Sequence, residues 1–493
     1  MEYRLSKQIL VRKEMINKYI TATILAIASS GVAAAQVSRP VPRLVVNIAI
    51  DQLRTDYMEA FMPSYGNNGF KKLLQNGIVY HNAQYTFAPV DRASSIASIV
   101  TGTSPSNNGI TGLKWLDKNT LIPVNCVDDH EYDGIFTKKK SSPKNIATTT
   151  INDELKISTD GAAVVYSIAM DRDAAVIGGG HAADGAIWFD EDNKCWCSSK
   201  YYFNKAPQWL EGYNLLSSNT ITVDNINSGI TSIALQCVSS CGMGKDNVPD
   251  MLSLTYDAKV PIDKDVLNKQ LLQYKYVQLD KELEKLISGI ESKVGKSNVL
   301  FVVTSTGYCN EKEIDYARYR IPSGTFYVNR TANLLNMYLG AIYGQDKYVE
   351  SCFYNQIFLN IKQIEQKRIN TSELLSRAQT FIMQLSGVSN VFTSKNLLLS
   401  GDNNSSRLRN WFFPNNCGDL VIEVSPGWKL FNEENFQQYT SKESTMPFPL
   451  VFYGTGVVAE EVTTPITIDR IAPTIAKAIR IRAPNACSVT PLH

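Results

Sequence analysis

The sequence predicts an α/β protein with a doubly wound, mostly parallel sheet, helices on both faces of that sheet, and a cap insertion. Apolar runs of strand length alternate with helical patterns along most of the 493 residues, as expected of a parallel sheet that is buried on both faces. The composition is that of a globular chain, with 44% hydrophobic and 19% charged residues. Such a chain can bury one large core or two smaller ones.

The strands and helices of this sheet can be placed from periodicity. Each apolar run has the length of a typical strand, and helical apolar patterns fall between the runs. The expected strands are residues 44–50, 163–168, 251–255, 299–304, 420–424 and 450–453. The expected helices are residues 69–76, residues 94–100, an amphipathic stretch from Leu279 to Ile290, and a last helix after Asp469.

Two stretches interrupt the alternation and predict how the chain is divided. Residues 185–245 are rich in Trp, Tyr, Asn and Cys, and we expect them to form an insertion in the core. Residues 310–395 carry a separate helical pattern and are expected to form the cap. The α/β core is therefore expected in two parts, residues 36–309 and 396–493.

The N-terminal residues predict export. Basic residues up to Lys18 precede an apolar stretch from Ile20 to Val32, and three alanines follow before Gln36. This is the layout of a secretory signal peptide over residues 1–35, and its apolar stretch of roughly 13 residues is shorter than the 20 or so that span a bilayer. Either Met1 or Met15 can serve as its start. We expect a protein of the periplasm or outer envelope, with no transmembrane span in the mature chain.

Nine cysteines in an exported chain allow disulfides, and the odd number leaves at least one thiol without an intrachain partner. Cys195 and Cys197 are separated by one residue, and Cys237 and Cys241 by three. Close pairs of this kind can hold zinc, form bridges or remain buried thiols. In an oxidising compartment we expect bridges or buried thiols, and the sequence assigns no pairing.

Ligands of an open α/β sheet bind beyond the carboxyl ends of its strands, where helix N-termini point inward. The segments at those ends are therefore the candidate site. They are Asp51 and residues 89–95, 170–173, 258–264, 305–308 and 445–449.

Several motifs occur along the chain in the order that one known family has them. They are Asp51-Gln52-Leu53-Arg54-Thr55-Asp56-Tyr57, Thr101-Gly102-Thr103-Ser104-Pro105, Gly179-Gly180-His181, Pro249-Asp250, Asn329-Arg330-Thr331, Gly427-Trp428 and Asp469-Arg470-Ile471-Ala472-Pro473-Thr474. Together they resemble type I phosphodiesterases and related bacterial alkaline phosphatases of the alkaline phosphatase superfamily. The resemblance covers almost the whole mature chain, is greatest to the periplasmic phosphate-monoester branch with a threonine nucleophile, and implies an alkaline phosphatase/sulfatase-like fold.

The resemblance implies a site with two zinc ions, which polarise a phosphate and activate a threonine or serine nucleophile. Asp51 stands at the first ligand position. The nucleophile of the family lies nine residues before Thr101, where this chain has Arg92, whose guanidinium has no lone pair with which to attack phosphorus or bind a metal. The remaining ligand positions fall on residues that do not suit zinc, namely Val260, Lys264, Thr306, Gly307 and Pro447.

The histidines and the expected substrate contacts agree with this loss. No histidine lies between residues 182 and 492, the interval to which the family's zinc-binding histidines belong. The resemblance implies two cationic side chains and an asparagine that contact the substrate. This chain has Asp171 and Asp173 at the two cationic positions and Leu113 at the position of the asparagine. We expect Arg92 to replace a zinc cation and to pair with Asp51, assisted by Asp171 or Asp173, because carboxylates are not left unpaired in a cavity.

Retained catalysis would need a different site. Ser94, Ser95, Asp91 and Cys309 are candidates, but hydroxyls at a helix start usually cap the helix. His181 follows three glycines and forms no recognisable triad with Tyr308 and Cys309.

The sequence therefore predicts a pseudoenzyme that binds an unknown partner protein or envelope component in a metal-free cleft. The expected binding residues are Asp51, Arg92, Asp171 and Asp173, and no cofactor is expected. The formal net charge of +2, without a long basic block, predicts no nucleic acid partner. The alternatives are an active phosphomonoesterase or phosphodiesterase with an altered site, and a structural scaffold of an envelope complex.

Overall fold

The structure is a computed structural model that describes residues 40–217, 221–222, 225–259, 269–308, 316–399, 405–434, 437–439 and 448–492. The described residues from Val41 onward belong to one compact unit. Among the described residues, no helix is both long enough and apolar enough to cross a membrane.

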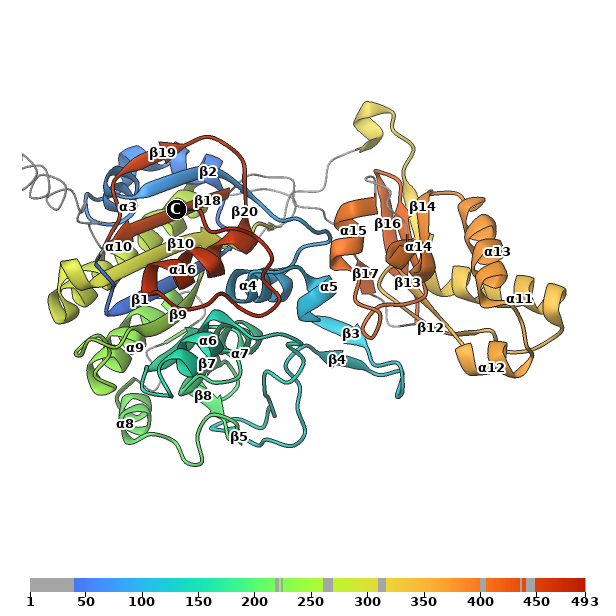
Figure 1. Ribbon diagram of the computed structural model, residues 1–493. Helices are drawn as coiled ribbons and strands as arrows, with labels where there is room; N and C mark the ends of the chain where they lie inside the picture. The colour runs from blue at the N-terminus through green and yellow to red at the C-terminus, as the bar shows by residue number, and fades with distance from the viewer. Residues whose placement is uncertain are drawn as a thin grey trace, which may run out of the picture. The chain divides into compact units, whose positions relative to one another are not determined.

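The main sheet has the strand order β19-β2-β18-β10-β1-β9-β6-β7-β8-β5, with β20 beside β2. The strands β10, β1, β9, β6 and β7 are parallel to one another, whereas β18, β2 and β8 each run antiparallel to a neighbour. The predicted α/β fold with a mostly parallel sheet is confirmed (Figure 1). The strands are β1 (Leu44–Asp51), β2 (Ile78–Gln84), β5 (Gly134–Ile135), β6 (Val165–Ala169), β7 (Gly185–Asp190), β8 (Cys195–Ser199), β9 (Asp250–Asp257), β10 (Val299–Ser305), β18 (Phe448–Gly454), β19 (Glu460–Val462) and β20 (Ile466–Thr467).

The residues of β1 explain why this sheet is covered on both faces. All eight of them are buried, and successive side chains of a strand point to opposite faces. Val45 and Ala49 belong to one hydrophobic cluster, and Val46 and Ile48 belong to another. Both faces of β1 therefore carry buried apolar side chains, with Asn47 and Asp51 beside Val45 and Ala49 on one of them, and each needs a layer of helices.

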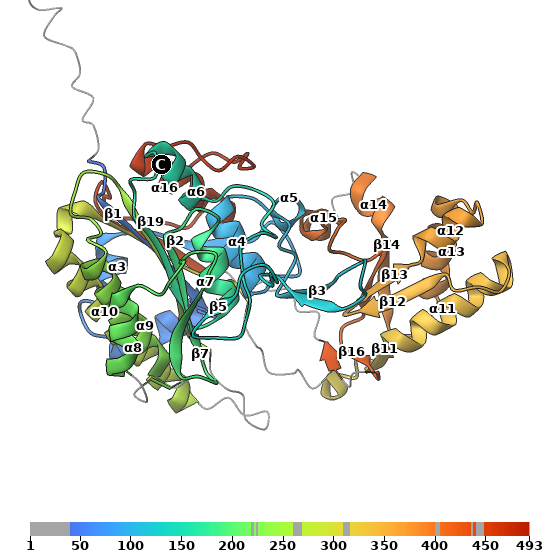
Figure 2. The same cartoon turned by 90° about the horizontal axis from the view of Figure 1, so that it is seen from below.

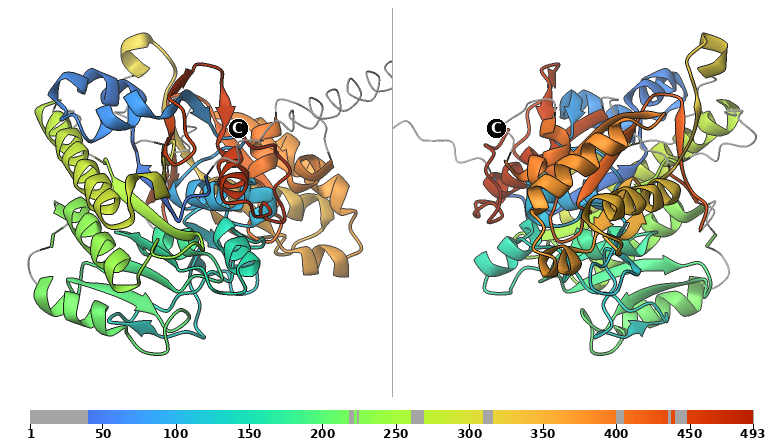
Figure 3. Two further views of the ribbon diagram at one scale, coloured as in Figure 1. Left: turned by 60° about the vertical axis from the view of Figure 1, so that its left-hand side comes forward. Right: turned by 90° about the vertical axis from the view of Figure 1, so that its right-hand side faces the viewer.

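Helices cover both faces of the main sheet (Figure 2). One layer contains α4 (Arg92–Thr101), α6 (Ile151–Ser158), α7 (Arg172–Gly179) and α16 (Ile471–Ile479). The other contains α2 (Thr55–Ala60), α3 (Phe70–Asn76), α8 (Gln208–Ser217), α9 (Ile226–Ser240) and α10 (Lys269–Val294). Helix α10 runs alongside α9 (Figure 3) and buries the stripe from Leu279 to Ile290 that periodicity predicts.

A second region carries smaller sheets with their own core. Helices α11 and α13 pack on the four-stranded sheet β12-β13-β15-β14 around Leu335, Leu374 and Ile422. The elements of this region are β11 (Gly324–Tyr327), α11 (Val328–Tyr343), β12 (Val349–Phe353), β13 (Gln356–Leu359), α12 (Ile361–Gln366), α13 (Thr371–Met383), β14 (Val388–Thr393), α14 (Ser394–Leu399), α15 (Ser406–Trp411), β15 (Leu420–Val424), β16 (Trp428–Asn432) and β17 (Gln437–Tyr439). Between α4 and α6 lie α5 (Pro105–Asn108) and the hairpin of β3 (Lys114–Leu116) with β4 (Pro123–Asn125).

Two parts of this arrangement differ from the expectations. Residues 420–424 form a strand, but this strand is β15 of the small four-stranded sheet, and β16 and β17 extend the second region beyond residue 395. Residues 185–245 are no separate insertion, because β7 and β8 extend the main sheet and α9 covers it. An apolar run predicts a strand but not its neighbours. In residues 185–245, Trp188, Trp196 and Cys237 are core residues and not the surface of an insertion.

Candidate functional site

The predicted site residues come together at the carboxyl ends of the parallel strands. Asp51 is the last residue of β1. Asp171 and Asp173 follow β6, at the start of α7. Arg92 is the first residue of α4. The two helix N-termini therefore bring one guanidinium and two carboxylates to the end of the strand that carries the third carboxylate.

Arg92 pairs with all three aspartates. Its Nε and Nη2 atoms donate to Oδ2 and Oδ1 of Asp173 at 3.0 and 2.9 Å. Its Nη1 atom lies 3.0 Å from Oδ2 of Asp171 and 3.7 Å from Oδ2 of Asp51. The expected pair with Asp51 is present, but the two-pronged pair with Asp173 has the shorter contacts. One positive charge thus faces three carboxylates, which leaves a formal excess of negative charge.

The cap of α4 holds Arg92 at this place. Asp91 is the N-cap residue, and its Oδ1 atom accepts hydrogen bonds from the backbone N–H and the hydroxyl of Ser94, at 2.9 and 2.8 Å. Its Oδ2 atom accepts from the N–H of Leu113 at 2.6 Å. The hydroxyl of Ser95 donates to the carbonyl oxygen of Thr306 at 2.6 Å. These candidate groups of the sequence therefore have structural partners.

Asp51 is buried, with 4% of its surface exposed. Its Oδ1 atom accepts from the hydroxyl of Thr306 at 2.8 Å, and its Oδ2 atom accepts from the hydroxyl of Tyr308 at 3.3 Å. The N–H of Gln52 donates to the Thr306 oxygen at 3.0 Å, which leaves the Thr306 proton free for Asp51. Burial raises the pKa of Asp51 to about 6, against the opposing charge of Arg92.

The described residues do not fit a site for two zinc ions. The oxygens of Asp51 accept hydrogen bonds from Thr306 and Tyr308, so they are turned toward hydrogen-bond donors. At Gly307 the backbone has φ +72°, and an added Cβ would lie 2.4 Å from the ring of Tyr85 and 2.7 Å from that of Phe448. A histidine has no room there. Among the residues that the structure describes, no three His, Cys, Asp or Glu side chains converge as metal ligands do.

Four of the candidate positions fall outside the described residues. They are Val260, Lys264, Cys309 and Pro447. Their places in the site stay predictions from the sequence.

Sequence reasoning missed Asp257, the last residue of β9, which lies opposite Asp51 in the register of the sheet. Its Oδ1 atom accepts from the N–H of Lys259 at 2.8 Å, and burial raises its pKa. The negative charge of Asp257 also raises the pKa of Asp51. Its place at the end of a predicted strand could have drawn attention to it.

His181 lies away from this cluster and has a structural role. Its Nδ1 atom is 3.0 Å from Oδ2 of Asp153, and its Nε2 atom is 3.1 Å from the carbonyl oxygen of Ile146. The hydrogen bond to Asp153 raises the pKa of His181, so the charged ring with two N–H donors is favoured. The pair ties the loop after α7 to the first turn of α6.

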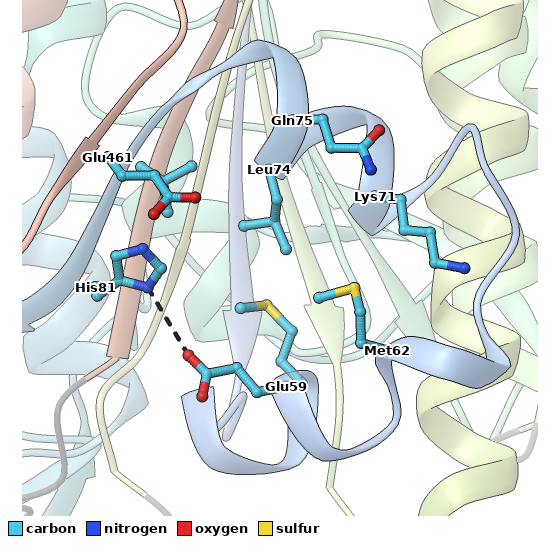
Figure 4. Close-up of a pocket in the computed structure, with 9 residues that line it drawn as sticks. Glu59, Met62, Lys71, Leu74, Gln75, His81 and Glu461 are labelled. Carbon is cyan, nitrogen blue, oxygen red and sulfur yellow. Dashed lines mark ion pairs between the residues drawn. The ribbon is translucent and has the colours of Figure 1, made fainter.

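A surface cavity of about 270 Å³ lies beside α2, α3 and β2 (Figure 4). Met58, Met62 and Leu74 give it an apolar wall, and His81 at its edge lies 3.8 Å from Glu59. It shares no lining residue with the cluster around Arg92. The sequence patterns did not reveal it, because its walls come from five separate elements, including the 3-10 helix at Met62 and strand β19 at Glu461.

Comparisons with known proteins agree with the fold. Residues 45–445 match the family described as Type I phosphodiesterase / nucleotide pyrophosphatase. Alkaline phosphatase PafA of Elizabethkingia meningoseptica is 24% identical over 94% of this chain and 96% of its own length. A protein named calcium-transporting ATPase, from Myroides odoratus, is 25% identical over 92% and 94%.

Solved structures give the same result at the level of the fold. The crystal structure of wild-type alkaline phosphatase PafA superposes with a TM-score of 0.77 at 22% identity and covers 92% of this chain and 98% of its own. Murine ectonucleotide pyrophosphatase / phosphodiesterase 5 superposes with a TM-score of 0.53 at 11% identity, over 89% and 95%.

Proposed function

Because the chain belongs to the type I phosphodiesterase / nucleotide pyrophosphatase family of the alkaline phosphatase superfamily, we propose that it is an exported pseudoenzyme of that family. In this proposal the protein keeps the family's fold but neither binds zinc nor hydrolyses phosphate esters. Its cleft serves to bind a partner protein or an envelope component.

The observation that carries this proposal is the set of ion pairs around Arg92. Arg92 occupies the position that the resemblance gives to the nucleophile, and its guanidinium is held by Asp173 and Asp171. A guanidinium keeps its proton at any physiological pH and has no lone pair to offer phosphorus or a metal. Arg92 therefore cannot replace a threonine or serine in the reaction.

Charge is a second argument against a phosphate ester as the ligand. The three aspartates outnumber the one arginine, whose charge is already paired. Two unit charges about 4 Å apart at a protein surface interact by about 4 kcal/mol. A phosphate dianion placed beside Asp51 would meet repulsion of this order, where the family has two divalent cations. The site around Arg92 therefore favours neutral or cationic groups of a partner.

The crowding at Gly307 extends the argument to a second element. Thr306 and Gly307 stand where the resemblance expects an aspartate and a histidine. Since no side chain fits at Gly307 without moving Tyr85 and Phe448, the loop after β10 supports the loss of the metal site independently of Arg92.

A hydrolysis assay tests the proposal. The purified mature protein is given an aryl phosphate and an aryl phosphodiester in excess zinc, with Asp51→Ala as the matched variant. We expect no turnover above that of Asp51→Ala. An Arg92→Thr variant, which restores a hydroxyl, should also stay inactive, because the other ligand positions remain unsuitable. Turnover in the unaltered protein that Asp51→Ala abolishes would mean an active enzyme and overturn the proposal.

Export and partner binding need a separate experiment. The basic and apolar pattern up to Val32 supports export to the periplasm or outer envelope. Cells expressing the tagged protein are fractionated, and the envelope fraction is cross-linked and purified by the tag. We expect the mature form in that fraction, with a bound component that an Asp171→Arg variant loses. Binding that Asp171→Arg leaves unchanged would assign the protein to a scaffold whose contacts lie outside the cleft.

A further inference from the structure

Two thiols lie in contact on β8, away from the cluster around Arg92. Cys195 and Cys197 are two residues apart on this strand, so their side chains point to the same face of the sheet. Their Sγ atoms are 3.7 Å apart. The Cys195 side chain is partly exposed, whereas Cys197 is fully buried. One thiol can therefore meet a reagent from solvent, and the other lies directly behind it.

One carbonyl group lies against both sulfur atoms. The carbonyl oxygen of Phe136 is 3.2 Å from Sγ of Cys197 and 3.8 Å from Sγ of Cys195. The side-chain amide of Asn193 donates to the same oxygen at 3.1 Å. These contacts hold the two thiols in fixed positions. The hydrogen bond from Cys197 also lowers the pKa of the Cys195 thiol, which favours the reactive thiolate at the exposed position.

We propose that Cys195 and Cys197 form an oxidisable dithiol that exchanges with small disulfides, and its encounter with an oxidising compartment rests on the export proposed above. The thiolate of Cys195 attacks a sulfur of the disulfide RSSR, which forms a mixed disulfide and releases RS⁻. The thiol of Cys197 then loses its proton and attacks the Cys195 sulfur, which closes the Cys195–Cys197 bond and releases a second RS⁻. The dithiol is oxidised by two electrons, RSSR is reduced by two, and the two thiol protons pass to solvent or to the released thiolates.

Geometry makes the product a labile bridge. A disulfide has its sulfur atoms about 2.0 Å apart, so the two atoms must approach by about 1.7 Å from their present positions. In a strand, residues i and i+2 have their Cα atoms about 6.6–6.8 Å apart, at the upper limit of roughly 6.8 Å for disulfides. The bridge is therefore strained, and strained bridges are reduced easily. This is the behaviour of a reversible redox site.

The other cysteines supply controls within the same chain. Cys126 and Cys417 are fully buried, and burial raises the pKa of both thiols. They should react slowly with any disulfide. All eight described cysteines are free thiols in the structure. The protein is fully reduced before the experiment, so that each thiol begins in the same state.

The position of the pair allows a direct test. Trypsin cleaves after Lys194 and Lys200, which releases the peptide of residues 195–200 with both thiols and no other cysteine. The mature protein is incubated with a graded ratio of oxidised to reduced glutathione, the remaining thiols are alkylated, and the digest is measured by mass spectrometry. We expect the peptide to lose two hydrogen atoms and escape alkylation under oxidising ratios, and to return to the dithiol under reducing ones.

Two single variants identify the order of attack. In Cys197→Ser the exposed Cys195 should accumulate the mixed disulfide with glutathione, because no second thiol resolves it. In Cys195→Ser the remaining Cys197 should react at least tenfold more slowly, at a rate close to those of Cys126 and Cys417. The proposal fails if the peptide stays a dithiol at every ratio, if it stops at a mixed disulfide in the unaltered protein, or if Cys197 reacts before Cys195.

Discussion

Replacing Arg92 with methionine is the sharpest structural perturbation of the site. It retains an unbranched aliphatic stem and removes the charged guanidinium. The side chains of Asp51 and Asp173 are each only 6% exposed, so water cannot take over from the lost cation. Removing one partner of a buried ion pair costs roughly 3–5 kcal/mol. Asp51 keeps its bonds from Thr306 and Tyr308, which places the expected loss near 3 kcal/mol at about pH 7.5.

The loss should depend on pH with a definite sign. Without Arg92, the folded-state pKa of Asp51 rises further above its unfolded value, so the variant gains stability as the pH falls. Each unit of further rise corresponds to about 1.4 kcal/mol. We expect the difference between the unaltered protein and Arg92→Met to shrink by at least about 1 kcal/mol between about pH 7.5 and pH 5.

Urea unfolding followed by tryptophan fluorescence measures both effects. Arg92→Lys is the matched control, because it keeps the charge and loses the fork toward Asp173, and it should cost less than Arg92→Met. The double variant Arg92→Met with Asp173→Asn also removes the carboxylate that has lost its partner. It should recover about half of the lost free energy of unfolding. A loss below about 1 kcal/mol for Arg92→Met, or one that stays constant with pH, would refute the view that Arg92 neutralises buried acids.

Three further predictions use the same measurement. The pKa of Asp51 is raised to about 6, so its protonated form stabilises the fold at low pH and this stabilisation is lost as the pH rises through that value. Relative to the unaltered protein, the free energy of unfolding of Asp51→Asn should therefore increase by up to about 3 kcal/mol from about pH 4 to pH 7. The absence of any relative increase would contradict this. The pKa of His181 is raised by Asp153, so the charged pair stabilises the fold below that pKa and is lost above it. His181→Gln should therefore lower the free energy of unfolding by about 1 kcal/mol near pH 6 and by less near pH 9. An equal loss at both pH values would exclude a charged pair. Gly307→Ala places a Cβ at a residue that has both a positive φ and crowded surroundings, so it should lower the free energy of unfolding by at least about 2 kcal/mol. In the control Gly161→Ala, with φ +81° and open space around the Cβ, only the backbone strain should be lost. Equal losses would show that crowding at Gly307 is unimportant.

The sequence predicts the fold well because its signals are local. In β1 apolar residues lie on both faces, interrupted only by Asn47 before Asp51, and in α10 they recur at helical spacing, so both elements could be placed without their neighbours. The partners of residues 420–424 could not, because strand pairing depends on contacts between distant segments. These residues therefore form a strand as predicted, but in the smaller sheet.

The candidate site shows the same division. Asp51, Arg92, Asp171 and Asp173 could be chosen because they lie in segments expected at the carboxyl ends of strands and at positions that the resemblance gives to the family's site. Arg92 donates two hydrogen bonds to Asp173 and none to Asp51. This choice depends on how α4 and α7 are placed relative to each other, which no sequence motif encodes. The rings that exclude a side chain at Gly307 come from β18 and from the segment after β2, so their closeness was invisible in the sequence.

Zinc binding at Asp51 is the most direct test of a silent active centre. The mature protein is incubated with excess zinc, passed through a desalting column and analysed for metal, beside Asp51→Ala treated in the same way. The cluster around Arg92 predicts equal zinc content in both proteins, since none of the metal depends on Asp51. Two zinc ions per chain in the unaltered protein that are missing from Asp51→Ala would contradict the account.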